Sequence, residues 1–502
     1  MNVPVLRRLR GAAAAGLLLP CLALSQDLAS FEKRITVKVL DNGLTLVVCE
    51  RHEAPVFSFF THVNVGSAQE VYGITGIAHM FEHMAFKGTE VVGTSNYAEE
   101  KVALAKVEDA YAAWHAEKGK VKPDQTRLAA TEKAFKDAVA EADKYVVKNE
   151  FDDIVERAGG VGLNAFTNTD ETGYFYSLPS NRLELWAYLE SERFLKPVFR
   201  EFYKERDVVQ EERRGGESDP IGRLIEQFTS TAYSAHPYRH PVVGWMSDLQ
   251  SFSATEAQKF YEKNYVPANM VVTIVGDVTP AEVVPLAERY FGRLVKRPVP
   301  DPLATVEPPQ IAEKEVILHE EAQPFYIEGY HKPAETDPDA EVYAAVSDIL
   351  SNGRVSRMYR SMVRDKKIAA FAAGFPGLPG QKYPNLFCFF GVPTPDHSTD
   401  EIKDAIRAEV ERLKSEDVTD EELRMVKTRA KADLIRGLGS NNGLARQLGS
   451  AQALYGDWRE LFRSVERIDK VTKADIRRVA NLTFTDSNRT VGIIATKKAE
   501  GK

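Results

Sequence analysis

The chain contains the same sequence pattern twice, and this internal repeat constrains the fold more than any other feature. Residues 268–277 (Ala-Asn-Met-Val-Val-Thr-Ile-Val-Gly-Asp) align without gaps with residues 487–496 (Ser-Asn-Arg-Thr-Val-Gly-Ile-Ile-Ala-Thr), at an offset of 219. A capping-box pattern, Ser253-x-x-Glu256 or Thr472-x-x-Asp475, precedes each copy and marks the start of a helix. Each copy is therefore predicted to be a β-branched strand that follows a helix. The repetition indicates a duplicated α+β unit.

A proline-rich segment separates the two copies and predicts a domain boundary. Residues 296–309 (Lys-Arg-Pro-Val-Pro-Asp-Pro-Leu-Ala-Thr-Val-Glu-Pro-Pro) show no hydrophobic periodicity, which is typical of a connector. A chain of 502 residues also exceeds what one hydrophobic core usually organises. We therefore expect an N-terminal domain at residues 26–295, a linker at 296–312 and a homologous C-terminal domain at 313–502.

Residues 1–25 are predicted to be a secretory signal peptide. Three arginines precede the apolar run of residues 12–24, and Ala23-Leu-Ser25 offers a small-residue cleavage site. An uncleaved anchor is the alternative, although the run is too short to span a bilayer comfortably. Cleavage removes three positive charges and no negative ones from a chain whose formal net charge is -8. An acidic mature protein is not expected to bind nucleic acid or anionic membranes.

The string His79-Met-Phe-Glu82-His83 is the strongest candidate for a functional site. Apolar residues at helical spacing surround it, and Thr75 is placed to cap the predicted helix. A helix puts His79 and His83 one turn apart on one face, with Glu82 beside them. Two imidazoles in this arrangement can hold Zn²⁺ if a third ligand comes from elsewhere, and Glu82 can then accept a proton from a metal-bound water. The alternative is a chance cluster on a solvated or partly buried face.

A second charged stretch offers the missing ligand. Glu205 and Glu212 are seven residues apart, which is two helical turns, so they share a face while Glu211 points elsewhere. One of the two can bind the metal and the other can accept a hydrogen bond from a histidine N–H. A solvated helix face is the commoner role of such a run of charges.

Three motifs in order resemble the pitrilysin/insulinase family of zinc peptidases, the inverzincins. They are His79-x-x-Glu82-His83-Met-Ala-Phe-Lys-Gly-Thr89, Leu163-Asn-Ala-Phe-Thr167 and Glu205-Arg-Asp-Val-Val-Gln-Glu-Glu212. Within the family the chain is most similar to the bacterial and mitochondrial-processing-type members with two homologous halves. The resemblance implies a clamshell of two α/β-sandwich halves, each an antiparallel sheet with helices, and a periplasmic zinc metalloendopeptidase. It makes His79, His83 and Glu212 the ligands of one Zn²⁺ per chain, Glu82 the general base and Glu205 the supporting carboxylate.

The spacing between His83 and Glu212 is longer than usual in that family. The surplus fits residues 99–149, which are predicted to form a helical hairpin broken near Gly119 and Pro123. Such an insertion leaves the site intact if its two ends lie close together. A partner-binding arm and a neutral decoration are both compatible with this sequence.

A predicted hairpin at residues 159–178 offers a place for a peptide substrate. Its first limb is flanked by glycines and polar enough to be a sheet edge, which can accept an extended peptide by main-chain pairing. The resemblance implies that Asn164, Ala165 and Phe166 hold the substrate in this way. An interior strand is the alternative.

Two further groups of residues are not expected to take part in the chemistry. His236 and His240 have ligand-like spacing, but Pro237 interrupts a helix there, so we expect a loop near the site without metal. Cys49 and Cys388 lie in apolar runs of different halves, and we expect buried free thiols rather than a disulfide.

The second half departs from the family pattern at one position. The family pairs an arginine with a tyrosine seven residues later to engage the substrate and stabilise the oxyanion. Here Arg364 is present, but Phe371 has no hydroxyl group to donate. We therefore expect the zinc-bearing subunit of a heterodimer, whose homologous partner supplies the Arg/Tyr pair. In one alternative the chain works alone and uses Tyr383 or a weaker oxyanion site. In another, Phe371 has no effect on activity. A third is a catalytically silent subunit of a larger complex, which the complete motif argues against.

Overall fold

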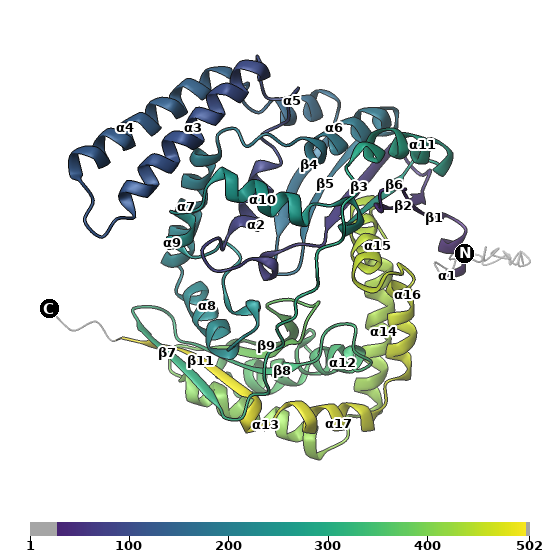
Figure 1. Ribbon diagram of the computed structural model, residues 1–502. Coiled ribbons are helices and arrows are strands. Elements are labelled where there is room, and N and C mark those ends of the chain that lie inside the picture. Colours follow the sequence, from purple (N-terminus) through teal and green to yellow (C-terminus); the bar gives the residue numbers. More distant parts are fainter. Residues whose placement is uncertain (1–27, 498–502) are drawn as a thin grey trace, which may run out of the picture.

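The computed structural model describes residues 28–497, and the predicted signal peptide at residues 1–25 lies outside them. The described chain forms two separate sheets with helices around them, which confirms the α+β fold class and the two-half clamshell (Figure 1). Among the described helices, none is both long and apolar enough to cross a membrane.

Five strands have the same order in both sheets, and the first sheet has an additional edge strand, Ile35–Val39. The first half contains β1 (Ile35–Val39), β2 (Thr45–Glu50), β3 (Val56–Val63), β4 (Val161–Thr167), β5 (Thr172–Pro179) and β6 (Met270–Gly276), in the order β1-β2-β6-β3-β5-β4. The second contains β7 (Lys314–Glu320), β8 (Phe325–Lys332), β9 (Ala369–Leu378), β10 (Asn385–Pro393) and β11 (Arg489–Thr496), in the order β7-β11-β8-β10-β9. In each sheet one pair is parallel, β2 with β6 and β7 with β11, and the other pairs are antiparallel. The edge strand β4 therefore corresponds to the edge strand β9.

The repeat found in the sequence is the helix and strand that close each half. α10 (Ala254–Asn264) leads to β6, and α17 (Lys473–Thr483) leads to β11. Both helices begin with the expected capping box, in which Ser253 pairs with Glu256 and Thr472 pairs with Asp475. Each side chain there satisfies a backbone N–H group that the first helical turn leaves free.

The remaining helices follow in chain order. The first half has α1 (Leu28–Glu32), α2 (Ile77–Met84), α3 (Tyr97–Lys118), α4 (Gln125–Ala142), α5 (Glu150–Arg157), α6 (Leu183–Leu195), α7 (Phe202–Ser218), α8 (Pro220–Ala232), α9 (Met246–Leu249) and α11 (Pro280–Tyr290). The second half has α12 (Ala340–Ser351), α13 (Thr399–Ser415), α14 (Asp420–Gly437), α15 (Asn441–Tyr455) and α16 (Glu460–Lys470). Residues 295–313 form neither helix nor strand, as expected of a connector.

One helix from each half packs on the sheet of the other half (Figure 1). α8, from the first half, packs on β7 and β11, and Phe228 fills the space over Gly329 and Gly492. α15, from the second half, packs on β3 and β6, where Gly449 allows close contact with Phe60. Neither sequence half is therefore a closed unit, and the exact boundary at residues 296–312 stays a prediction.

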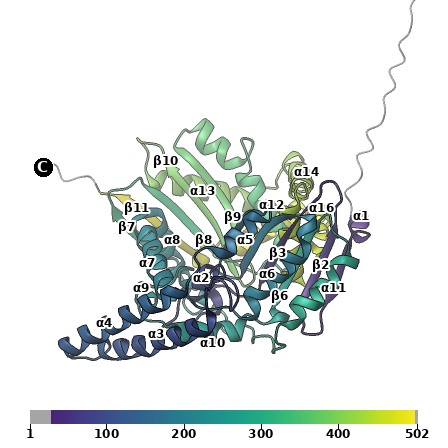
Figure 2. The same cartoon turned by 90° about the horizontal axis from the view of Figure 1, so that it is seen from above.

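The inserted hairpin consists of α3 and α4, which project from the body of the first half (Figure 2). Asn96 and Asp124 cap the two helices, and Trp114 stacks on Phe135 at 5.6 Å between ring centroids. An isolated β-bridge joins Thr94 to Val146, so the ends of the insertion lie side by side. This closeness lets the chain continue past the insertion without displacing its neighbours.

The two cysteines of the described chain are free and buried, in β2 and β10 of different sheets. Burial raises the pKa of Cys49 to about 11, so this thiol stays protonated at neutral pH. Cys388 is fully buried and its pKa is raised for the same reason.

Candidate metal centre

α2 carries the two histidines on the side that its apolar residues leave free. Ile77, Ala78, Met80, Phe81 and Met84 are buried in the core of the first half. His79 and His83 share the other face, with ring centroids 4.8 Å apart. The spacing of apolar residues in the sequence predicted this helix.

The start of α2 is held by two acids that the sequence did not indicate. Glu70 accepts hydrogen bonds from the N–H groups of Gly76 and Ala78, at 2.9 and 2.8 Å. Asp248 accepts from the N–H and the hydroxyl of Thr75, so Thr75 is not the cap that we expected. Burial raises the pKa of Glu70, and the backbone N–H groups oppose that shift. Carboxylates at this end also suit the positive pole of the helix dipole.

The predicted ligands converge on one point. His79 Nε2 and His83 Nε2 each lie 3.7 Å from Glu212 Oε2, and the three potential ligand atoms lie within 4.8 Å of one another. Tetrahedral zinc ligands at about 2.0–2.2 Å from the ion lie roughly 3.4 Å apart, so the group fits one ion with a small adjustment. It is the only group of three or more such side chains that could hold a metal within residues 28–497.

Burial favours the neutral, metal-binding form of His79. Burial, together with the smaller effect of the neighbouring His83, lowers the pKa of that imidazole to about 4. The buried Nδ1 atom of His79 has no hydrogen-bond partner among the described residues. At His83 burial acts in the same direction, but the hydrogen bond with Glu205 and the charge of Glu212 outweigh it and raise the pKa.

Glu205 contacts the ring nitrogen of His83 that is not directed at Glu212. Its Oε2 atom lies 3.3 Å from His83 Nδ1, and Lys87 forms an ion pair with Oε1. Both predicted acids of this stretch lie on α7, on one face of the helix, as the seven-residue spacing predicted. Arg206 and Arg213 on the same helix are buried instead, and Arg206 Nη1 donates to the Tyr111 hydroxyl and to the Phe252 carbonyl.

Glu82 lies between the histidine pair and the edge of the first sheet. Burial raises its pKa, and hydrogen bonding to Thr167 on β4 opposes this. Together with His83, Asn164 and Ala165 it lines a cavity of about 310 Å³. Within residues 28–497, β4 pairs with β5 alone, so its other side is an open edge of the described sheet, as predicted.

The structure does not bring Arg364 to this group. Arg364 Nε pairs with Asp365 Oδ1 at 2.6 Å on the surface of the second half. Phe371 lies on the edge strand β9, 53% exposed, with its ring against Phe390. Tyr383 donates its N–H to the Tyr238 hydroxyl at 3.2 Å, and its ring packs against His236. Among the described interactions, neither Arg364 nor Tyr383 contacts a member of the histidine–glutamate group.

His236 and His240 lie in a buried loop around a short 3₁₀ turn at Pro237–Arg239. His236 Nδ1 accepts from the Tyr238 N–H, and His240 Nδ1 lies 3.8 Å from Glu70 Oε2. Burial lowers the pKa of both histidines. The loop is close to the start of α2, as expected, but it belongs to the support of that helix and not to the candidate ligands.

Two family models match the chain. Insulinase (Peptidase family M16) matches residues 46–112 and 138–244, and Peptidase M16 inactive domain matches residues 251–430. The unmatched residues 113–137 fall in the distal part of the inserted hairpin.

Similar proteins come from several bacteria. "Zinc protease PqqE" of Helicobacter pylori is 29% identical over 96% of this chain and 97% of its own length. A solved structure of a protease from Helicobacter pylori, 28% identical, superposes with a TM-score of 0.75 over 92% of this chain and 99% of that one. At 16% identity, the first half of the periplasmic protease PqqL from Escherichia coli has a TM-score of 0.67 and covers 92% of both chains, which shows a shared fold.

Proposed function

The chain belongs to the pitrilysin/insulinase family, peptidase family M16, and we propose that it is a zinc metalloendopeptidase that hydrolyses peptides or unfolded segments. The observation that carries the proposal is the convergence of His79, His83 and Glu212, with Glu82 beside them at an open sheet edge. Relatives described as zinc proteases support the same ion.

In the proposed site, His79, His83 and Glu212 hold the metal. When bound, Zn²⁺ acidifies a water molecule and polarises the carbonyl of the peptide bond to be cleaved. Glu82 is the general base that accepts the proton of that water and later passes it to the leaving amine, and its raised pKa makes it a stronger acceptor in the first of these transfers. Glu205 fixes the orientation and tautomer of His83 through its hydrogen bond with Nδ1.

The peptide is proposed to bind as an added strand beside β4. Asn164, Ala165 and Phe166 would pair with it through their main chain, because no other described strand pairs with the outer edge of β4. Asn164 and Ala165 line the same cavity as Glu82, so a peptide on this edge passes directly by the base. Arg364, carried over from the family pattern, is proposed to engage substrate in the complete assembly.

We propose further that the chain is the zinc-bearing subunit of a heterodimer. Phe371 cannot donate a hydrogen bond to an oxyanion, and Arg364 is on the surface with Asp365 as its ion-pair partner. Complete PqqL of Escherichia coli, which shares the fold at 17% identity, is about twice as long, because this chain covers 48% of it. A second homologous chain with an Arg/Tyr pair would give an assembly of that size. The alternative of a catalytically silent subunit is disfavoured by the full set of ligands and base.

Export to the periplasm is part of the proposal. Its support is the predicted signal peptide at residues 1–25 and the likeness to PqqL, which is described as periplasmic. The negative formal charge of the chain suits neither nucleic acid nor an anionic membrane as a partner.

The test is cleavage of a quenched fluorescent peptide library by the zinc-loaded mature chain, alone and mixed with a homologous subunit that carries the Arg/Tyr pair. Cleavage that appears only in the mixture, and that a chelator abolishes, supports the heterodimer. Full activity of the lone chain supports the peptidase and rejects the need for a partner. No cleavage in either case, with zinc verified, would favour the silent subunit.

A further inference from the structure

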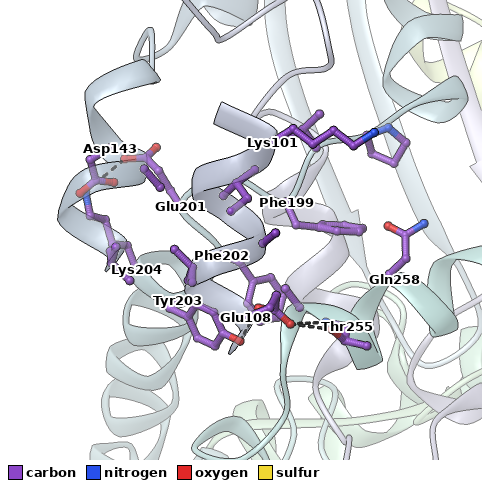
Figure 3. A pocket seen from close by; sticks show the side chains of 18 of the residues that line it. Lys101, Glu108, Asp143, Phe199, Glu201, Phe202, Tyr203, Lys204, Thr255 and Gln258 are labelled. Carbon is purple, nitrogen blue, oxygen red and sulfur yellow. Dashed lines mark hydrogen bonds and ion pairs between the residues drawn. The ribbon is translucent and has the colours of Figure 1, made fainter. Parts of the chain in front are cut away.

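A second cavity lies where the inserted hairpin joins the body of the first half. It has a volume of about 440 Å³ and is lined by α3, the end of α4, the start of α7 and α10 (Figure 3). Of the described residues, Glu201 alone lines both this cavity and the one beside Glu82. Its size falls within the range of about 300–1,000 Å³ that is common for small-molecule sites.

The interior of this cavity is apolar. Phe199 and Phe202 lie in its middle, with the labelled polar groups around them (Figure 3). Further aliphatic residues complete the lining, among them Leu104, Val107, Val139, Ala142 and Val198. Such a lining favours an aliphatic chain over a polar ligand, because each buried methylene leaves water.

The carboxylates at the rim already have partners. Glu108 accepts hydrogen bonds from the Tyr203 hydroxyl and from the N–H and hydroxyl of Thr255. Asp143 and Glu201 both pair with Lys204, at 2.7 and 3.6 Å. Asp143 and Glu201 are therefore ion-paired, and Glu108 is hydrogen-bonded, so each of the three acids already has a partner within the protein.

Two lysines at the rim, unlike Asp143 and Glu201, have no partner of opposite charge among the described residues. Lys101 on α3 and Lys259 on α10 line the cavity and are exposed, and within residues 28–497 neither has a carboxylate within 4.0 Å. An apolar cavity with uncompensated ammonium groups at its mouth is complementary to a molecule with an apolar tail and an anionic head.

We propose that this cavity binds a free alkanoate of medium or long chain. The aliphatic tail occupies the space around Phe199 and Phe202, and the carboxylate lies at the rim with Lys101 and Lys259. The assignment does not depend on the peptidase function, because its residues are separate from His79, His83 and Glu212.

The test is isothermal titration of the full mature chain with hexanoate, octanoate, decanoate and dodecanoate below their micelle concentrations. Affinity is expected to rise by up to about fourfold per methylene until the cavity is full, and decanol is expected to bind more weakly than decanoate. Lys101→Glu should weaken decanoate binding by about tenfold. Ala105→Trp, which places an indole over the cavity from an exposed position, should abolish it.

Matched controls come from the same helix. Lys106→Glu and Ala113→Trp are exposed changes on α3 outside the cavity, and both should leave the affinity unchanged. The melting temperature of each variant shows whether it is folded. Absence of binding, equal effects of the cavity and control variants, or decanol binding as tightly as decanoate would each overturn the proposal.

Discussion

Glu205 Oε2 lies 3.3 Å from His83 Nδ1, and this contact determines which nitrogen of His83 faces Glu212. The imidazole donates its Nδ1–H to the carboxylate, which leaves the Nε2 lone pair for a metal. Lys87 holds the other carboxylate oxygen, so Glu205 is itself fixed.

The first prediction concerns Glu205→Gln. An amide accepts more weakly than a carboxylate, so the affinity for zinc should fall by about 10- to 100-fold. Competition with a chromogenic chelator measures this. Glu211→Gln on the same helix is the control, because Glu211 is exposed and Arg214 is its one ion-pair partner among the described residues. Equal zinc affinity of the two variants would show that Glu205 does not contribute to zinc binding through His83.

The base of the inserted hairpin is predicted to be structural. Arg200, 1% exposed, pairs with Glu100 and donates to the carbonyls of Lys87, Thr89 and Val92. Glu100→Gln leaves the guanidinium buried without its counter-charge and should lower the free energy of unfolding by about 3–5 kcal/mol. Urea unfolding measures the change, and the exposed Glu99→Gln should change it by less than about 0.5 kcal/mol. Similar values for both would mean that the Arg200–Glu100 pair does not stabilise the base of the hairpin.

The exchange of helices between the halves gives a third prediction. Phe228 on α8 is fully buried against the second sheet, so Phe228→Ala should cost about 3–5 kcal/mol. Ile221→Ala, at a half-exposed position of the same helix, should cost much less. Denaturant unfolding compares them. A small loss for Phe228→Ala would mean that α8 does not seal that sheet.

Stability at acid pH should depend on Glu422. Burial opposes its charge, but Arg357 and the Thr419 cap lower its pKa from 4.5 to about 2. Because the folded-state pKa is below the unfolded one, the stabilisation is complete above pH 4.5 and is lost as the pH falls from 4.5 toward 2. Glu422→Gln should therefore lose about 1–3 kcal/mol at pH 6 and little at pH 2.5. Unfolding at several pH values tests this, with the exposed Glu421→Gln as control; a loss that does not shrink with pH would contradict it.

Local patterns were sufficient to predict the parts of the fold that are built from neighbouring residues. The capping boxes at Ser253 and Thr472 and the helix with His79 and His83 follow from sequence spacing. Their side chains are brought together by helical or strand periodicity alone, which the sequence displays directly.

Features that depend on distant residues were not predictable in this way. Glu70, in the segment before α2, and Asp248, on α9, hold the start of α2, and nothing beside Thr75 in the sequence indicates them. α8 and α15 each pack on a sheet whose strands are far away in the sequence. The need for glycine at position 449 is evident only in the folded structure, where Phe60 packs against it. The same holds for the cavity at the hairpin base, whose walls come from four helices.

The most direct test of the central claim is the rate of peptide cleavage by Glu82→Gln at a verified zinc content, measured in whichever form, lone chain or heterodimer, is active. Glu82 is not a member of the ligand group, so the variant should retain one zinc per chain. Without the base, kcat should fall by about 10²–10⁴-fold. Full zinc occupancy with unchanged kcat would contradict the assignment of Glu82 and the mechanism built on it.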